Sequence, residues 1–244
     1  MTEYASRPGA AGTRPGTRPT AIVTGASRGI GRAIARRLAR DYDIVATARD
    51  EGALETLAGG IDADGGRCTP VAVDLTHPDS IAASLGGLDA DVLVNNAGVW
   101  YKKPLLELTP AEWHEMVDVN FNALYHVTRA VLPRMVARGR GHVVVIGSIA
   151  GRSAFVGGTC YAATKHAVMG FAESLLLEVR HSGVKVSVVM PGSVATDMFG
   201  TEADPTWMLG PGDVAEAVAH VLATPPAVLV HRLEVRALKP PKKS

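Results

Sequence analysis

The chain has little cysteine, little excess charge and no long hydrophobic run, and each shortage excludes a class of protein. Its two cysteines, Cys68 and Cys160, cannot form the disulfide framework of a small secreted domain, and they lack the spacing of a metal site. We therefore predict no bound metal and a reduced, cytoplasmic setting. A net charge of +1, with acids and bases mixed along the chain, indicates neither a nucleic-acid nor an anionic-membrane surface, so we expect neither partner.

The two ends of the sequence differ in composition from the rest. Residues 1–18 are rich in Pro, Gly, Thr and Arg and contain no apolar run, which predicts a disordered tail rather than a signal peptide or a membrane helix. Residues 237–244 form a short basic tail. Between them no linker and no repeat divides the chain, so residues 19–236 are predicted to form one domain.

Short β-branched runs alternate with stretches of helical period through this domain. Strands are predicted over 20–25, 42–48, 68–74, 91–98, 142–148, 184–192 and 227–235. Helices are predicted near 29–40, 51–59, 77–85, 111–138, 160–181 and 212–223. The alternation indicates a single doubly wound, Rossmann-type α/β domain with a mostly parallel seven-stranded sheet and helices on both faces. A ligand on such a sheet binds at the carboxyl ends of the strands.

The loop after the first strand, TGASRGIG, places Gly25, Gly29 and Gly31 directly before a helix. Glycines let the backbone approach a pyrophosphate closely, and the helix N-terminus offers free N–H groups. Glycines also make ordinary tight turns. The position between a strand and a helix favours a dinucleotide site.

The end of the second strand bears on which dinucleotide is bound. An NAD-binding protein usually places an acid there for the ribose 2′-hydroxyl, whereas this strand ends in Ala48 and Arg49. Asp50 comes later and is better explained as a helix cap. Arg49, together with Arg28, could hold a 2′-phosphate, although both could also be solvated surface arginines. We predict NADP(H).

Polar residues also follow the third and fourth strands. Asp74, which closes the third strand with Leu75, could accept from an adenine amino group or cap the helix near His77. The sequence NNAG, residues 95–98, suits backbone turning beside a ribose, and it suits any other turn.

With the glycine loop, NNAG, Ser148, YAATK (residues 161–165) and Pro191-Gly192 in this order, the chain resembles the short-chain dehydrogenase/reductase family in its compact single-domain branch. The resemblance runs from about Thr20 to about Val235. It implies a catalytic tetrad of Asn120, Ser148, Tyr161 and Lys165. It also implies cofactor contacts from Tyr161, Lys165 and these residues: Gly25, Ser27, Arg28, Gly29, Ile30, Gly31, Asp74, Leu75, Asn96, Ala97, Gly98, Pro191, Gly192, Val194 and Thr196.

The side chains of YAATK suggest how such a site would work. A free tyrosine, with a pKa of about 10, is a poor acid–base group near neutral pH. Lys165, four residues along the same helix, is expected to lower the pKa of Tyr161 and to hydrogen-bond the nicotinamide ribose. Ser148 is expected to hold the substrate oxygen. Asn120 would hold a water linking Lys165 to solvent if it interrupts its helix; otherwise it is a polar residue satisfied within that helix.

The same helix carries two stripes of different character. Tyr161, Lys165 and the apolar residues Val168, Ala172, Leu175 and Val179 share one face. The opposite face is small and weakly polar: Ala163, Ala167, Gly170, Ser174 and Leu177. Either another helix of the chain covers it, or it is a subunit contact. Because the family commonly forms tetramers through this helix, we expect a homo-oligomer, a tetramer or a dimer.

The substrate is the least determined part of the prediction. Residues 197–210 should form a short lid, whose Met198, Phe199, Trp207, Met208 and Leu209 could line an apolar pocket with Trp100, Phe155 and Val156, or could pack as loop anchors. The glycine pair that ends many acyl-carrier-protein reductases of the family is missing. We therefore expect a reductase of ketones, aldehydes or 3-oxo compounds. A 3-oxoacyl-carrier-protein reductase, an alcohol-oxidising enzyme and a non-catalytic NADP-binding regulatory protein remain the alternatives.

Overall fold

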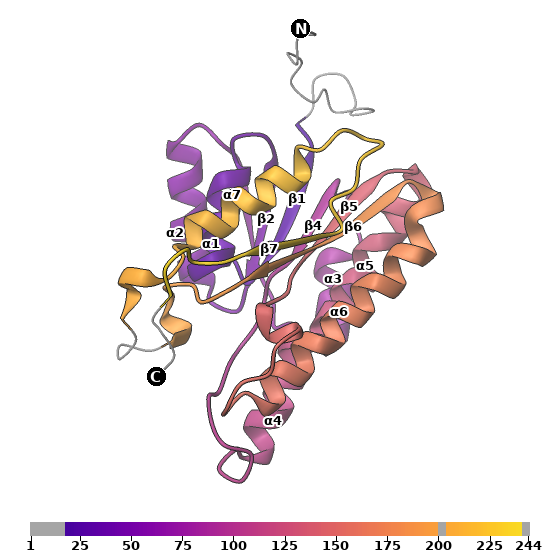
Figure 1. Ribbon diagram of the computed structural model, residues 1–244. Coiled ribbons are helices and arrows are strands. Elements are labelled where there is room, and N and C mark those ends of the chain that lie inside the picture. The colour runs from indigo at the N-terminus through magenta and orange to yellow at the C-terminus, as the bar shows by residue number, and fades with distance from the viewer. Residues whose placement is uncertain (1–17, 200–203, 241–244) are drawn as a thin grey trace, which may run out of the picture.

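A seven-stranded sheet forms the centre of the molecule (Figure 1). The computed structural model describes residues 18–199 and 204–240. The strands lie in the order β3-β2-β1-β4-β5-β6-β7, and every neighbouring pair is parallel. The predicted doubly wound α/β fold is therefore confirmed. The strands are β1 Thr20–Thr24, β2 Asp43–Ala48, β3 Cys68–Ala72, β4 Val92–Asn95, β5 Gly141–Ile146, β6 Val184–Pro191 and β7 Arg232–Val235.

Helices cover both faces of the sheet because successive strand residues point to opposite sides. In β1, Ala21 and Val23 belong to one apolar core and Ile22 to the other. The first core packs α1 Gly29–Leu38, α2 Glu51–Ala63 and α7 Pro211–Leu222 on the sheet; the second packs α3 Pro78–Leu85, α5 Ala123–Arg138 and α6 Thr159–Val179. Among the described helices, none is long and apolar enough to span a membrane.

The helix predicted over 111–138 is interrupted. It consists of α4 Pro110–Val117, a π-helical turn over Asp118–Asn122 and then α5. The turn places Asn120 so that its side chain bonds the backbone of Val99 in a distant loop. This long-range contact, which the hydrophobic period of the sequence does not contain, accounts for the break.

The last strand begins later than predicted, at Arg232 rather than at residue 227. Side chains of β6 bind the preceding backbone instead of a strand ladder. Lys185 Nζ donates to the carbonyls of Pro225 (2.8 Å) and Val228 (2.6 Å), and Ser187 Oγ donates to that of Val230 (2.7 Å). These carbonyls are satisfied without strand pairing, so the segment turns rather than extends.

The edge strand β3 contains a proline. Arg67 and Val73, on either side of β3, exchange backbone hydrogen bonds with β2, so alternation turns the backbone N of residues 68, 70 and 72 away from β2. The outward N–H of Cys68 donates to Asp62 Oδ1, and position 70 is a proline without an N–H. The outer edge of β3 is therefore poor in donors.

The two faces of α6 differ as predicted. On the first face Lys165, Val168, Ala172, Leu175 and Val179 are buried and Tyr161 is half-buried. On the second face Ala163, Gly170, Ser174 and Leu177 are exposed and Ala167 is half-buried. Within the described part of the chain, no helix covers this second face.

Candidate active site

The glycine loop is folded so tightly beneath α1 that Gly25 and Gly31 have no room for a side chain. Gly25 and Gly29 have φ of +66° and +54°, in the left-handed region that favours glycine. A Cβ on Gly31 would lie 2.2 Å from the Gly25 carbonyl oxygen and 2.5 Å from Asn96 Nδ2. The loop thus presents bare backbone at the carboxyl end of β1.

The start of α1 leaves its backbone donors available. Its N-cap residue, Arg28, makes no side-chain cap, and the first turn contains no acidic residue. Ser27 and Ile30 are half-buried beside it. Free N–H groups and the positive end of the helix dipole suit an anion, and the cradle left by the glycines brings that anion close. These residues fit the pyrophosphate of a dinucleotide.

Thr24 joins this loop to the NNAG turn. Its Oγ1 accepts hydrogen bonds from the backbone N of Asn96 (2.9 Å) and Ala97 (3.1 Å), and Asn96 Nδ2 donates to the carbonyls of Thr24 (2.9 Å) and Gly25 (3.3 Å). Gly98 is less confined than Gly31, since a Cβ there would lie 3.2 Å from Asn120 Oδ1. Sequence reasoning missed Thr24, although a hydroxyl in the residue before the glycine loop was a usable signal.

Asp74 closes a turn after β3. Its Oδ1 accepts from the backbone N (2.9 Å) and the hydroxyl (2.8 Å) of Thr76, and these hydrogen bonds, with smaller help from the charges of Arg49 and His77, hold the carboxyl pKa below its usual range. His77 is the N-cap of α3, so Asp74 does not cap that helix. Leu75 is buried beside it. By contrast, Asp50 caps α2 as predicted, accepting from the Ala53 N.

Both predicted 2′-phosphate ligands are exposed. Arg49 stands free of the sheet at the end of β2, close enough to Asp74 to affect its pKa. Arg28 pairs with Asp197 at 3.8 Å, and both side chains are more than two-thirds exposed. This ion pair was not foreseen. Because an exposed pair of this length contributes little energy, Arg28 can leave Asp197 for a stronger anion.

The segment after β6 is anchored next to the glycine loop. The Gly192 N donates to the Val235 carbonyl (2.8 Å), continuing the direction of Pro191 at the end of β6. Val194 is buried and pairs with Leu209. Thr196 stands against Gly29, where an added Cβ would lie 3.4 Å from its methyl group. Of the four residues predicted here, Thr196 therefore lies against the glycine loop.

Tyr161, Ser148 and Lys165 converge at the carboxyl end of β5. A side-chain hydrogen bond joins Ser148 to Tyr161, and Lys165 Nζ lies 5.7 Å from the centroid of the Tyr161 ring. Lys165 is only 5% exposed and donates to the Ile146 carbonyl at 3.0 Å. A phenol, a hydroxyl and an ammonium group thus meet beside the glycine loop.

The direction of the tyrosine pKa corrects the expectation from sequence. Burial raises the pKa of Tyr161, and the Ser148 hydrogen bond opposes this only in part. Burial also lowers the pKa of Lys165 to about 8. Desolvation of the phenolate therefore outweighs the Ser148 hydrogen bond in this protein chain, and the phenol form is favoured.

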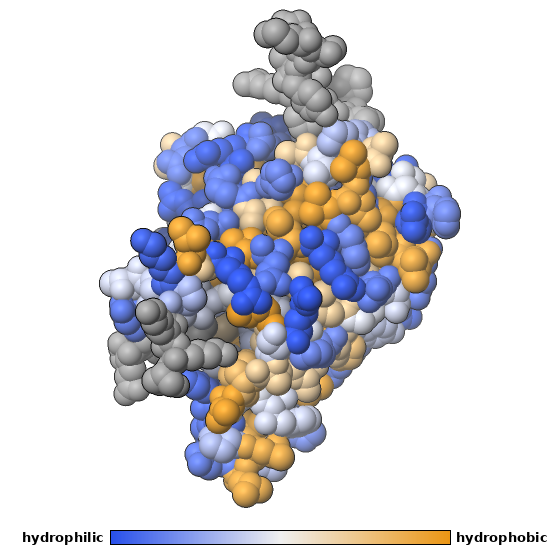
Figure 2. All heavy atoms as spheres, viewed as in Figure 1, coloured by the Kyte–Doolittle hydropathy of each residue, from blue (hydrophilic) through white to orange (hydrophobic). Residues whose placement is uncertain are grey.

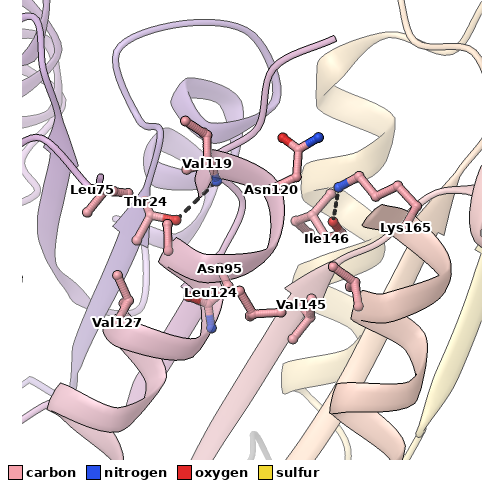
Figure 3. A pocket seen from close by; sticks show the side chains of 13 residues that line it. Thr24, Leu75, Asn95, Val119, Asn120, Leu124, Val127, Val145, Ile146 and Lys165 are labelled. Carbon is pink, nitrogen blue, oxygen red and sulfur yellow. Dashed lines mark hydrogen bonds between the residues drawn. The ribbon is translucent and has the colours of Figure 1, made fainter. Parts of the chain in front are cut away.

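Asn120 and Lys165 border a small cavity of about 10 Å³, also lined by Thr24 and Asn95 (Figure 3). Asn120 Oδ1 accepts from the Val99 N (2.8 Å), and its Nδ2 donates to the Val99 carbonyl (3.0 Å) and to Thr164 Oγ1 (3.2 Å). The side chain is thus satisfied outside its own helix. A space of this size with several polar walls suits one water molecule.

Two aromatic rings, those of Trp100 and Phe155, lie beside Tyr161. Trp100 lies 5.7 Å from Tyr161 between ring centroids and 6.0 Å from Phe155. Of the predicted lid, Leu209 is buried as an anchor, Trp207 and Met208 are half-buried, and Met198 is 39% exposed. Residues 200–203 and the side chain of Phe199 lie outside the described part of the chain, so the predicted pocket wall there stays a prediction.

Comparisons with known proteins agree with this geometry. A family model described as short chain dehydrogenase matches residues 19–206. Retinol dehydrogenase 8 of Bos taurus is 40% identical over 165 residues, a match that covers 65% of this chain and 52% of that protein, about half its length. The 3-oxoacyl-acyl-carrier-protein reductase of Vibrio harveyi is 35% identical over 207 residues, covering 78% of this chain and 83% of that one. A metagenomic short-chain oxidoreductase solved in complex with NADP is 38% identical with a TM-score of 0.80, covering 91% and 98% of the two chains.

Proposed function

Because the chain belongs to the short-chain dehydrogenase family, whose members are oxidoreductases, we propose that it is an NADP(H)-dependent enzyme acting on a carbonyl or secondary alcohol, with Tyr161 as general acid/base. The observation that carries the proposal is the meeting of Tyr161, Ser148 and Lys165 beside a glycine cradle. We propose reduction of ketones, aldehydes or 3-oxo compounds as the main reaction.

The cofactor would be held by the backbone around the glycine loop. When bound, NADP(H) supplies or accepts the hydride. The free N–H groups at the start of α1 would take its pyrophosphate, and Lys165 would hydrogen-bond the nicotinamide ribose. Arg28 and Arg49 are exposed and can reach a 2′-phosphate, which favours the phosphorylated cofactor. The likeness to a structure solved with NADP supports the same preference.

Tyr161 would donate the proton that a reduced carbonyl oxygen requires. Because burial raises its pKa, the resting side chain is a protonated phenol, the form needed for reduction. Ser148, already hydrogen-bonded to Tyr161, would hold the substrate oxygen within reach of that proton.

Lys165 and Asn120 would return the proton to Tyr161 after each turnover. With a pKa of about 8, Lys165 can gain and lose a proton near neutral pH. Among the described residues, its ammonium group has one hydrogen-bond acceptor, the Ile146 carbonyl, although it can donate three hydrogen bonds. A water in the cavity beside Asn120 would take another and would connect the lysine to the polar cavity wall.

Two other functions remain in competition. The match to the Vibrio harveyi enzyme supports an acyl-carrier-protein substrate, whereas the missing glycine pair after β7 speaks against it. A non-catalytic NADP-binding protein would have no need of a buried lysine beside a tyrosine. A protein of that kind should bind NADPH but turn over no carbonyl substrate.

The experiment is a screen of NADPH and NADH against aldehydes, ketones and 3-oxo esters, read by nicotinamide absorbance. Tyr161→Phe should bind NADPH normally and lose at least about a hundredfold in kcat, the usual contribution of a general acid. Tyr125→Phe, an exposed tyrosine on α5, is the matched control and should keep full activity. Full turnover by Tyr161→Phe would exclude the mechanism, and NADPH binding without turnover of any carbonyl would favour the non-catalytic reading.

We also propose that two copies associate through the exposed face of α6. Gly170 has no atom within 4 Å of a Cβ position, and Leu177 is 62% exposed although it is apolar. Small residues let a second helix approach closely, and burying the leucine would stabilise the contact.

A further inference from the structure

Tyr161 is enclosed on its outer side by two aromatic rings from separate loops. Trp100 comes from the loop after β4 and Phe155 from the loop before α6. The Trp100 ring lies 5.7 Å from the Tyr161 ring at an interplanar angle of 39°, and the Phe155 ring lies 6.5 Å from Tyr161 at 63°. The Trp100 and Phe155 rings meet edge to face at 6.0 Å and 83°. This arrangement of Trp100 and Phe155, here called the aromatic clamp, borders the hydroxyl proposed to donate the proton.

A glycine holds Phe155 in this place. A Cβ on Gly158, the N-cap of α6, would lie 2.4 Å from the Phe155 ring. Gly158 has a φ of −110°, which any residue can adopt, so its backbone does not require glycine. The absence of a side chain at Gly158 therefore makes room for the Phe155 ring, which packs directly on the first turn of α6.

The clamp continues outward into exposed apolar side chains. Val156 is 91% exposed and Leu106 is 99% exposed. Their loops touch, because the Lys103 N donates to the Gly157 carbonyl at 3.2 Å. In Figure 2 apolar side chains gather at the lower end of the molecule, where Figure 1 places α4 and its neighbouring loops. Exposed apolar side chains thus lie on the two loops beside the clamp.

Charged side chains near the clamp bind one another. Lys103 Nζ donates to Glu112 Oε1 at 2.5 Å, and the Tyr101 hydroxyl donates to Glu115 at 2.5 Å. Lys102 is exposed and forms no ion pair with a described residue. The groups in contact with Tyr161 on this side are aromatic, which favours a neutral apolar ligand over a charged one.

From this geometry we infer that the clamp selects neutral carbonyl substrates that carry an aryl ring or a group of similar bulk, with Trp100 and Phe155 as the specificity-determining residues. The inference rests on the proposed function. The carbonyl oxygen would point to Ser148 and Tyr161 while the substrate ring packs against the exposed side of the Trp100 and Phe155 pair, and any longer apolar extension would cover Val156.

The test compares three methyl ketones that differ in ring and charge: butan-2-one has no ring, acetophenone has a neutral ring, and acetophenone with a para-carboxylate has a charged ring. For the native protein, kcat/KM for acetophenone should exceed that for butan-2-one by at least about tenfold, since one stacked ring contributes about that factor. Trp100→Ala and Phe155→Ala should remove most of this advantage, seen as a fall in the acetophenone to butan-2-one ratio of kcat/KM that comes mainly from a higher KM for acetophenone. Gly158→Ala should act like Phe155→Ala because its methyl group displaces the ring.

Two measurements keep the inference separate from the proposed function and from folding. Calorimetric titration of acetophenone into the protein without nucleotide reports clamp binding even if no ketone is turned over. Trp100→Phe and Phe155→Leu, which keep apolar bulk, should retain part of the preference if an alanine variant does not fold.

Each outcome decides one point. Turnover without preference for acetophenone, or a preference that survives both alanine variants, would overturn the clamp and leave the oxidoreductase intact. Faster turnover of the carboxylate than of acetophenone would overturn the neutral class and point to Lys102. Absence of all turnover with normal acetophenone binding would remove the proposed function and retain the clamp as a binding site.

Discussion

Replacement of Gly31 by alanine should separate two effects: the loss of cofactor affinity when the glycine cradle is displaced, and the gain in stability that alanine normally brings to a helix. A Cβ at this position would lie 2.2 Å from the Gly25 carbonyl oxygen, whereas ordinary van der Waals contact begins at 3.4 Å. The difference, 3.4 minus 2.2, requires a shift of 1.2 Å between α1 and the backbone that follows β1. Both partners are backbone atoms or the anchored Asn96 amide, so neither can rotate away.

Two energies of opposite sign act on this variant. Alanine in a helix interior is favoured over glycine by about 1 kcal/mol. Overpacking against fixed atoms costs about 1–3 kcal/mol. The net loss of unfolding free energy should therefore be about 2 kcal/mol at most. The effect on the cofactor should be larger, since a displacement of about 1 Å in a positioned site can cost about a hundredfold in function.

Gly59→Ala is the matched control. Gly59 also lies inside a helix, α2, but no atom lies within 4 Å of its Cβ position. It should gain about 1 kcal/mol in unfolding free energy with unchanged cofactor affinity. Urea unfolding and fluorescence titration with NADPH measure both quantities. The reasoning fails if Gly31→Ala gains stability like Gly59→Ala and binds NADPH as tightly as the native protein.

Three further perturbations follow from the structure. Burial lowers the pKa of His142 to about 3, so this imidazole stays neutral in the folded protein at pH values where it takes up a proton in the unfolded chain. The free energy of unfolding should therefore fall as the pH drops below about 6.5, by up to about 1.4 kcal/mol per pH unit. His142→Gln should flatten this slope in urea titrations at pH 4–7. Arg49→Ala should weaken NADPH binding about tenfold and NADH little, and equal weakening would refute a 2′-phosphate contact. Ala163→Arg should shift the sedimentation coefficient to that of a monomer, whereas an unchanged value would exclude the α6 contact.

The sequence predicted the parts of the molecule that depend on local signals. The parallel sheet follows from the alternation of strands and helices, and the places of Gly25 and Gly31 follow from the tight turn between β1 and α1. Asp50 was predicted as a cap because capping is decided by neighbouring residues. The convergence of Ser148, Tyr161 and Lys165 came from the resemblance to a family rather than from the hydrophobic period.

Features set by distant contacts could not be predicted. The break before α5 depends on Asn120 reaching Val99, and the late start of β7 depends on Lys185 holding carbonyls across a gap of about forty residues. The direction of the Tyr161 pKa depends on how deeply the ring is buried, which spacing along a helix does not reveal. In each case the tertiary environment outweighs the local pattern.

Pro70 has a consequence for how this molecule behaves in a crowded solution. The edge strand of an open parallel sheet can pair with a strand of another molecule, and this pairing is a common first step of aggregation. The Cys68 amide already donates to Asp62, and residue 70 has no amide hydrogen. A strand that approached β3 would therefore find few backbone hydrogen-bond donors. We expect Pro70→Val to leave the fold intact and to make the protein precipitate at lower concentration.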